Sequence, residues 1–202
     1  MKSEKQIVRD EINTGRMETF SDAVIAVIIT IMVLELRPPH GAAITELIKT
    51  IPLFLAYILS FISIGIYWNN HHHLLHVTKR ISGKVMWANL HLLFWISLIP
   101  FGTTWIGEHP FEQWPVMFYG FINLASALAY LLLSRTIIKA NKDTPFEEAF
   151  GDDKKGKTSF KLYIAGILIA FFYPPVSYLF YASVAIMWFI PDRRLNRVHD
   201  HS

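Results

Sequence analysis

The chain has 202 residues, of which 52% are hydrophobic and only 17% are charged, and its mean hydropathy is +0.33. A typical soluble domain carries about 25% charged residues, so this composition excludes an ordinary soluble protein and favours a polytopic membrane protein. The sequence contains no cysteine, which excludes disulfides, thiolate nucleophiles and cysteine-ligated metals.

Long apolar segments predict six membrane-spanning helices, because a spanning helix needs about 20 mostly apolar residues. The prolines at 174–175 divide the apolar stretch 160–190 into two rather short helices. The polar stretch 141–159 is predicted to be a linker or a short surface helix. One transmembrane domain is expected over residues 1–202, with helices at 19–36, 46–73, 85–106, 114–138, 160–173 and 176–190.

The basic residues orient these helices. With the N-terminus in the cytoplasm, six helices place all 19 lysines and arginines except Arg37 and Lys49 on the cytoplasmic side. Five or seven helices would lose this asymmetry. The sequence therefore predicts an all-α fold with both termini cytoplasmic. Because the charges gather on one side of a membrane, the pI of about 9.1 does not indicate nucleic-acid binding.

The first helix, within residues 16–36, begins with polar and charged residues as far as Asp22. An apolar run that contains Thr30 follows. Charged groups at membrane depth are costly and need a partner or a water-filled path. At about 100° per residue, Asp22 points about 140° away from Val27. The face that Val27 shares is completed by Thr30, Ile31 and Leu34. From spacing alone, ordinary helix packing is the favoured interpretation of this face, and a functional surface is the alternative.

The motif Arg16-x-x-x-Phe20-Ser21-Asp22 resembles the signature of the non-classical potassium channels of endosomes and lysosomes and their bacterial homologues. Residues 67–72 (Tyr-Trp-Asn-Asn-His-His) are similar to the Trp-x-x-His-His segment that ends the family's second helix. Residues 89–90 and 97–101 are similar to its third-helix pattern. Ala23 departs from the family, which often has glycine after the aspartate.

The resemblance implies a homotetramer whose four first helices line a central pore without a Thr-Val-Gly-Tyr-Gly filter, and the sequence contains no such motif. It also implies an apolar constriction and a hydroxyl layer on the first helix. By position, these residues are Val27, Thr30, Ile31 and Leu34. A narrow apolar ring is poorly wetted, and potassium sheds water at lower cost than sodium. Hydroxyls of Thr30 would replace part of the lost hydration.

The polar residues of the motif are expected to form a buried network that holds the pore helix. Its expected members are Arg16, Phe20, Ser21, Asp22, His71, His72 and Asn89. Without the resemblance, a helix cap explains Ser21 and Asp22 equally well. Glu35 at the outer mouth would either concentrate cations or serve as a solvated helix end.

Among the histidines at 71–73 and 76, His72 and His76 have a spacing that could bind zinc. No nearby glutamate completes a zincin motif. We therefore expect these histidines to mark a helix end at the membrane interface. No metal or other cofactor is expected. The sequence also lacks paired carboxylates, a phosphate loop and an activated nucleophile, so an enzyme is not expected.

These observations predict a leak-type, potassium-preferring cation channel in a bacterial inner membrane. Its expected partners are identical subunits, the lipid bilayer, and K⁺ and other monovalent cations. The alternative is a secondary transporter or proton-coupled permease that uses Asp22 and the histidines. Transporters usually contain repeats with matched helix breaks, whereas this sequence has one proline break without a counterpart.

Overall fold

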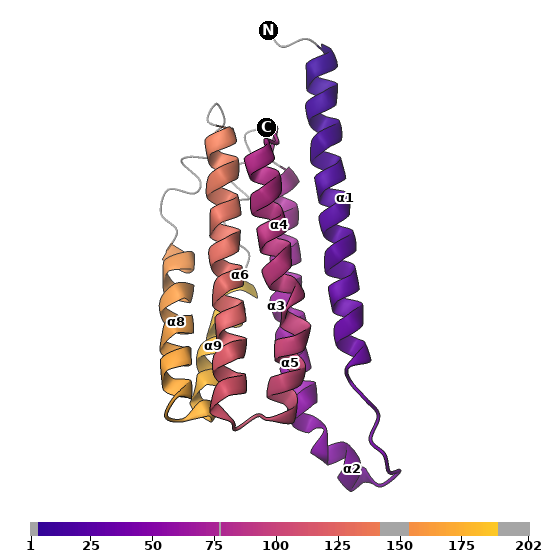
Figure 1. Cartoon of the computed structure of the whole chain (residues 1–202), viewed down its shortest axis with the longest axis vertical. Coiled ribbons are helices and arrows are strands. Elements are labelled where there is room, and N and C mark those ends of the chain that lie inside the picture. The colour runs from indigo at the N-terminus through magenta and orange to yellow at the C-terminus, as the bar shows by residue number, and fades with distance from the viewer. Residues whose placement is uncertain (1–3, 77, 142–153, 190–202) are drawn as a thin grey trace.

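In the computed structural model, the described residues are 4–76, 78–141 and 154–189; they form helices and connections and contain no strand. The predicted all-α fold class is therefore confirmed. The long helices alternate in direction along the chain (Figure 1). The helices are α1 (Glu4–Leu34), α2 (Ile44–Lys49), α3 (Ile51–His76), α4 (Gly83–Ser97), α5 (Ile99–Glu108), α6 (Gln113–Ala140), α8 (Lys154–Ala170) and α9 (Pro174–Phe189).

Four helical stretches within the described residues are long and apolar enough to cross a membrane: Thr14–Leu34, Ile51–His76, Gly83–Glu108 and Gln113–Ala140. The last two helices, α8 and α9, have 17 and 16 residues. Each is about 25 Å long, somewhat less than the roughly 30 Å of a bilayer's hydrocarbon core. The count of six crossings therefore stays a prediction.

Several helix ends differ from the sequence prediction. The first helix begins at Glu4 rather than at residue 19, because hydropathy locates the apolar part of a helix and not its polar extension. The stretch 154–159, predicted as part of a linker, is the beginning of α8. Three parts of the prediction lie outside the described residues: the stretch 142–153, the final residue of the predicted sixth helix, and both chain termini.

Two predicted helices are each divided in two. The predicted helix 46–73 is interrupted at Thr50, between α2 and α3, and the predicted helix 85–106 is interrupted at Leu98, between α4 and α5. Pro52 and Pro100 are the second residues of α3 and α5. Proline lacks the N–H group that a continuous helix would need there, but it is tolerated in a first turn.

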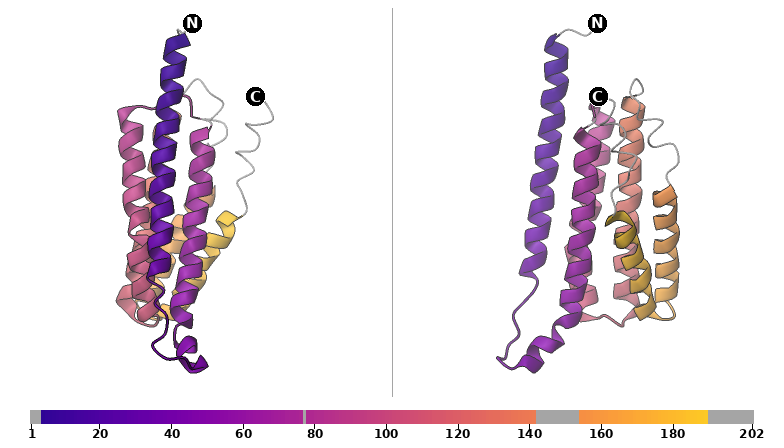
Figure 2. Two further views of the ribbon diagram at one scale, coloured as in Figure 1. Left: turned by 90° about the vertical axis from the view of Figure 1, so that its right-hand side faces the viewer. Right: turned by 180° about the vertical axis from the view of Figure 1, so that it is seen from behind.

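Helix α6 lies at the centre of the bundle, where it packs against α4, α5, α8 and α9. Helix α1 lies at one edge and contacts α3, α4 and α5, while the α8–α9 hairpin covers the opposite side (Figures 1 and 2). Fully buried side chains such as Ile64, Leu92 and Leu133 fill the space between α3, α4 and α6. This arrangement leaves much of α1 exposed among the described residues of the subunit.

Candidate functional site

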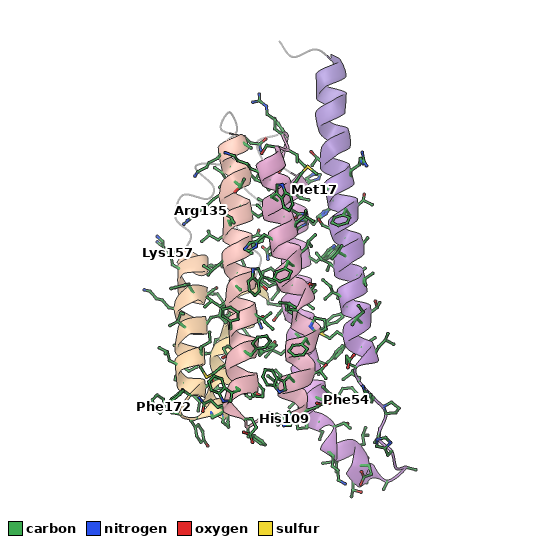
Figure 3. The ribbon with its side chains drawn as sticks, viewed as in Figure 1. Met17, Phe54, His109, Arg135, Lys157 and Phe172 are labelled. Atoms are coloured by element: carbon green, nitrogen blue, oxygen red, sulfur yellow. The ribbon has the colours of Figure 1, made fainter. Side chains whose placement is uncertain are left out.

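One face of α1 packs against the bundle. Its buried residues recur every three or four positions, which is the spacing of a single helical face. They are Met17, Ser21, Ile25, Ile28 and Met32. Figure 3 shows the first of them, Met17, between α1 and the rest of the bundle. The buried stripe therefore fixes which way the remaining side chains of α1 point.

The opposite part of α1 carries Val27, Thr30, Ile31 and Leu34, and we call these four residues the open face of α1. Val27 is 54% exposed and Leu34 is 76% exposed. The Thr30 hydroxyl donates a hydrogen bond to the Val27 carbonyl oxygen, at 2.8 Å. Because its proton is directed at the backbone, the two lone pairs of the oxygen are left to meet a cation or water.

A chain of buried hydrogen bonds joins α1, α4 and α3. Asn89, only 1% exposed, donates from Nδ2 to Ser21 Oγ at 2.9 Å, and its Oδ1 lies 2.7 Å from His71 Nε2. The Ser21 hydroxyl donates in turn to the Met17 carbonyl oxygen, at 2.8 Å. Since Asn89 Oδ1 can only accept, the His71 proton lies on Nε2. We call Ser21, Asn89 and His71 the three-helix contact.

Two further side-chain pairs join α1 to α3. Asp22 Oδ1 accepts a hydrogen bond from Trp68 Nε1 at 3.0 Å, and Glu18 Oε1 lies 2.8 Å from His72 Nδ1. The two residues that each helix contributes are four apart, and the helices are antiparallel, so the two pairs are consecutive rungs one helical turn apart. Asp22 thus faces α3, on the side of α1 away from Val27.

The structure therefore brings together five of the seven residues expected in the polar network. Ser21, His71 and Asn89 share the three-helix contact, while Asp22 and His72 form the neighbouring rungs. Arg16 and Phe20 are exposed and lie outside these hydrogen bonds. The aromatic ring of Phe20 instead lines a groove between α1 and α5.

This α1–α5 groove is mostly apolar and has a volume of about 660 Å³. Val27 and Ile31 lie along its α1 wall, and Phe101 and Thr104 lie along its α5 wall. Glu35, the expected outer-mouth residue, lies at the end of the groove just beyond α1 and is half-buried. Val27 and Ile31 of the open face therefore form one groove surface together with residues of α5.

Sequence reasoning missed several of these contacts. Glu18 and Trp68 were not expected in the polar network, although each lies four residues from an expected member on its own helix. A buried hydroxyl pair near the other end of α1 was also missed. Thr103 Oγ1 lies 2.6 Å from Ser60 Oγ and 3.9 Å from Met32 Sδ. Helical spacing places Glu18 and Trp68 on the same faces as expected members, but their pairing depends on the register between α1 and α3, and nothing local marks Thr103.

The histidines at the end of α3 lie close together, and the rings of His72 and His76 stack with centroids 6.1 Å apart. Across the part of the chain that the structure describes, no three His, Asp or Glu side chains converge as a metal ion would require. His72 instead pairs with Glu18. The arrangement is that of a helix-to-helix contact.

Comparison with known proteins agrees with this architecture. Residues 16–100, which contain the three-helix contact and both rungs, match the model of the family described as endosomal/lysosomal potassium channel TMEM175. A protein from Chryseobacterium sp. named as a potassium channel is 49% identical over 184 residues, which is 91% of this chain and 96% of that protein. The chain belongs to the TMEM175 family.

Two further comparisons show lower sequence identity to this chain. A protein named as a potassium channel from Chamaesiphon minutus is 32% identical over 130 residues, covering 60% of this chain and 64% of that protein. The crystal structure of a lysosomal potassium-selective channel TMEM175 homolog from Chamaesiphon minutus superposes with a TM-score of 0.77 at 25% identity, covering 89% of this chain and 98% of that one. The resemblance predicted from the sequence is confirmed, and the TMEM175 family is one of channels, not enzymes.

Proposed function

We propose that this chain is one subunit of a leak-type, potassium-preferring cation channel in a bacterial inner membrane. Its bacterial relatives and the similar crystal structure are named as potassium channels. The observation that carries the proposal is the division of α1 into two sides. One side is fixed by buried packing and hydrogen bonds, while the open face stays largely exposed among the described residues of the subunit.

In the proposed assembly, four identical subunits place four α1 helices around a central pore, since a symmetric oligomer repeats one such helix around its axis. Rings of Val27, Ile31 and Leu34 then form a narrow apolar constriction that water fills poorly. The ring of Thr30 hydroxyls offers oxygen ligands to an ion that has shed part of its hydration. Few fixed dipoles are involved, so potassium preference is modest. Glu35 lies at the outer mouth and raises the local concentration of cations.

In the proposed topology, six helices cross the membrane and both termini are cytoplasmic. The support is the distribution of charge. Arg135 and Lys157 lie toward one end of the bundle, and His109 and Phe172 lie at the other (Figure 3). Among the basic residues, only Arg37 and Lys49 belong to the α1–α3 connection at the second end, which accords with a cytoplasmic first end. On this proposal α8 and α9 cross as a short hairpin.

A transporter or proton-coupled permease would use Asp22 and the histidines as a relay. Here Asp22 and His72 have partners on neighbouring helices and face away from the open face of α1. A relay through them would run inside the subunit and not along the apolar side of α1. Current that follows the potassium gradient alone, without a proton gradient, distinguishes the channel from this alternative.

The test of the pore assignment is a pair of Thr30 variants in reconstituted bilayers. Thr30→Val removes four hydroxyls from the tetramer while keeping the side-chain shape, and Thr30→Ser keeps the hydroxyls. We expect Thr30→Val to lower the potassium-to-sodium permeability ratio by about two- to fivefold, because the differential value of a hydrogen-bonding group is about 0.5–1 kcal/mol. Thr30→Ser should stay near wild type. An unchanged ratio in Thr30→Val would remove Thr30 from the ion path.

A further inference from the structure

A second groove lies between the beginning of α4 and the end of α6, away from α1. Its volume is about 980 Å³. Three basic side chains line it: Arg80 from the α3–α4 connection, Lys84 from α4 and Lys139 from α6. No acidic residue is among the described residues that line it. The groove therefore concentrates positive charge over a surface that α1 and its pore-related contacts do not use.

The wall of this groove is held in place by Asn141. The Asn141 Oδ1 accepts hydrogen bonds from the backbone N–H groups of Lys79 and Arg80, at 3.2 and 2.8 Å, and its Nδ2 donates to the Arg80 carbonyl oxygen at 3.1 Å. Asn141 is buried and follows the last residue of α6. The α3–α4 connection is thus fixed to the end of α6, so the basic groove exists before any ligand arrives.

The side chains in the groove change character with depth. The basic residues Lys84 and Lys139 lie in the first turn of α4 and the last turn of α6. Trp87 follows one turn further along α4 and is 75% exposed. Leu132 lies seven residues from Lys139, about 10 Å deeper along α6. On α4, His91 lies at a similar depth to Leu132 and accepts a hydrogen bond from Trp95. Cationic groups at the mouth, a tryptophan one turn deeper and an aliphatic side chain beyond it follow the order that a phospholipid meets at a membrane surface.

We propose that this groove binds one anionic glycerophospholipid from the leaflet on the basic side of the membrane. The headgroup phosphate lies among Arg80, Lys84 and Lys139, and the N-terminal end of α4 adds its positive dipole. The glycerol region packs beside Trp87, and an acyl chain runs along Leu132. Basic pockets between transmembrane helices recognise anionic headgroups in this way. A free phosphate would use only the basic end of the groove, at Arg80, Lys84 and Lys139.

The proposal requires that the chain lies in a membrane, but it does not rest on ion conduction. Its test is therefore a binding measurement on the intact assembly in detergent, separate from any recording of current. Native mass spectrometry counts the lipids retained after addition of phosphatidylglycerol or phosphatidylcholine of matched chain length. The variant Lys84→Gln/Lys139→Gln removes two charges from the groove. Lys157→Gln/Lys161→Gln removes two charges from α8, outside the groove, and serves as the control.

We expect the wild type and the control to retain phosphatidylglycerol about 30-fold more than phosphatidylcholine, because two nearby lysines together attract an anionic lipid by about 2 kcal/mol, which corresponds to about 30-fold. The groove variant should lose this preference. Equal retention of phosphatidylglycerol by the groove variant and the wild type would overturn the proposal. So would equal loss in the control, which would show that general surface charge is responsible.

Two additional measurements keep the result interpretable. The altered lysines are exposed side chains, so the groove variant should keep the subunit stoichiometry and melting temperature of the lipid-free wild type. Glycerol phosphate without acyl chains should raise the melting temperature less than phosphatidylglycerol does. An equal rise would assign the groove to a soluble phosphorylated anion and would overturn the lipid proposal, whatever the outcome of the Thr30 recordings.

Discussion

Asn89→Ala tests whether the three-helix contact holds α1 in place. Asn89 is buried, and it bonds both to Ser21 on α1 and to His71 on α3. The substitution leaves α4 continuous, since alanine is the best helix former. It removes the only side chain among the described residues that hydrogen-bonds with both of the other helices at this point.

The expected loss follows from the groups left behind. Removal of the amide leaves His71 Nε2–H without its acceptor, and His71 Nδ1 already has no hydrogen-bond partner among the described residues. Ser21 keeps its bond to the Met17 carbonyl oxygen. A buried polar group without a partner costs about 1–3 kcal/mol, and the small cavity adds to it. We expect a loss of about 2–4 kcal/mol in the free energy of unfolding.

The assay is thermal denaturation of the purified protein in detergent, followed by the fraction of intact assembly. For a chain of this size, about 1 kcal/mol corresponds to about 2–4 °C in melting temperature, so Asn89→Ala should lower it by about 5–15 °C. Ser21→Ala should cause a smaller decrease, because Asn89 then loses only one acceptor. Leu90→Ala, a change at the next and exposed residue of α4, is the control.

The permeability ratio completes this test. Asn89 does not belong to the open face of α1, so channels that still assemble should keep the wild-type preference for potassium. A melting temperature within 2 °C of wild type would refute the idea that this contact holds α1. A changed permeability ratio without a change in melting temperature would instead place Asn89 in the ion path.

Two other substitutions test the open face of α1 and the packing of α5 against α3. Leu34→Ser should raise the single-channel conductance by about two- to fivefold, because a polar ring wets the constriction, whereas Leu34→Ile should not; equal currents in the two variants would contradict the assignment of Leu34. Gly107→Ala should lower the free energy of unfolding by about 1–3 kcal/mol in a thermal melt, since its new Cβ would lie 2.8 Å from Leu53 Cα. The control is Gly65→Ala, whose new Cβ would have nothing within 4 Å. Similar melting temperatures for both alanine variants would refute the packing argument.

The fold class was predictable because the length of each apolar segment and the positions of the charged residues can be read from the sequence. The division of helices at Thr50 and Leu98 was not predicted, although Pro52 and Pro100 were visible. A proline in an apolar run permits either a kinked helix or a new helix, and the choice depends on neighbours that the sequence does not show. Hydropathy also could not locate the start of α1, because its first turns are polar.

The partners of Asp22 illustrate a different limit. Helical geometry indicates which side of α1 carries Asp22, since that depends only on residues within one helix. Its partner depends on the register between α1 and α3, which the connection 35–50 and the packed core decide together. A shift by one turn would bring another residue of α3 to Asp22. Trp68 was therefore not identifiable from the sequence, even though it precedes His72 by one turn on α3.

The same reasoning explains why polar contacts hold α1 while its open face stays apolar. In lipid, an apolar side chain gains little by moving from acyl chains to a neighbouring helix, so hydrophobic burial alone fixes neither register nor orientation. Hydrogen bonds between helices supply that specificity, and α1 makes them through Ser21, Asp22 and Glu18. These three residues lie within one turn of each other and leave the following helix free of charged groups as far as Glu35. A helix anchored near the start of its apolar stretch in this way can present Val27, Thr30 and Leu34 to ions without a charge among them.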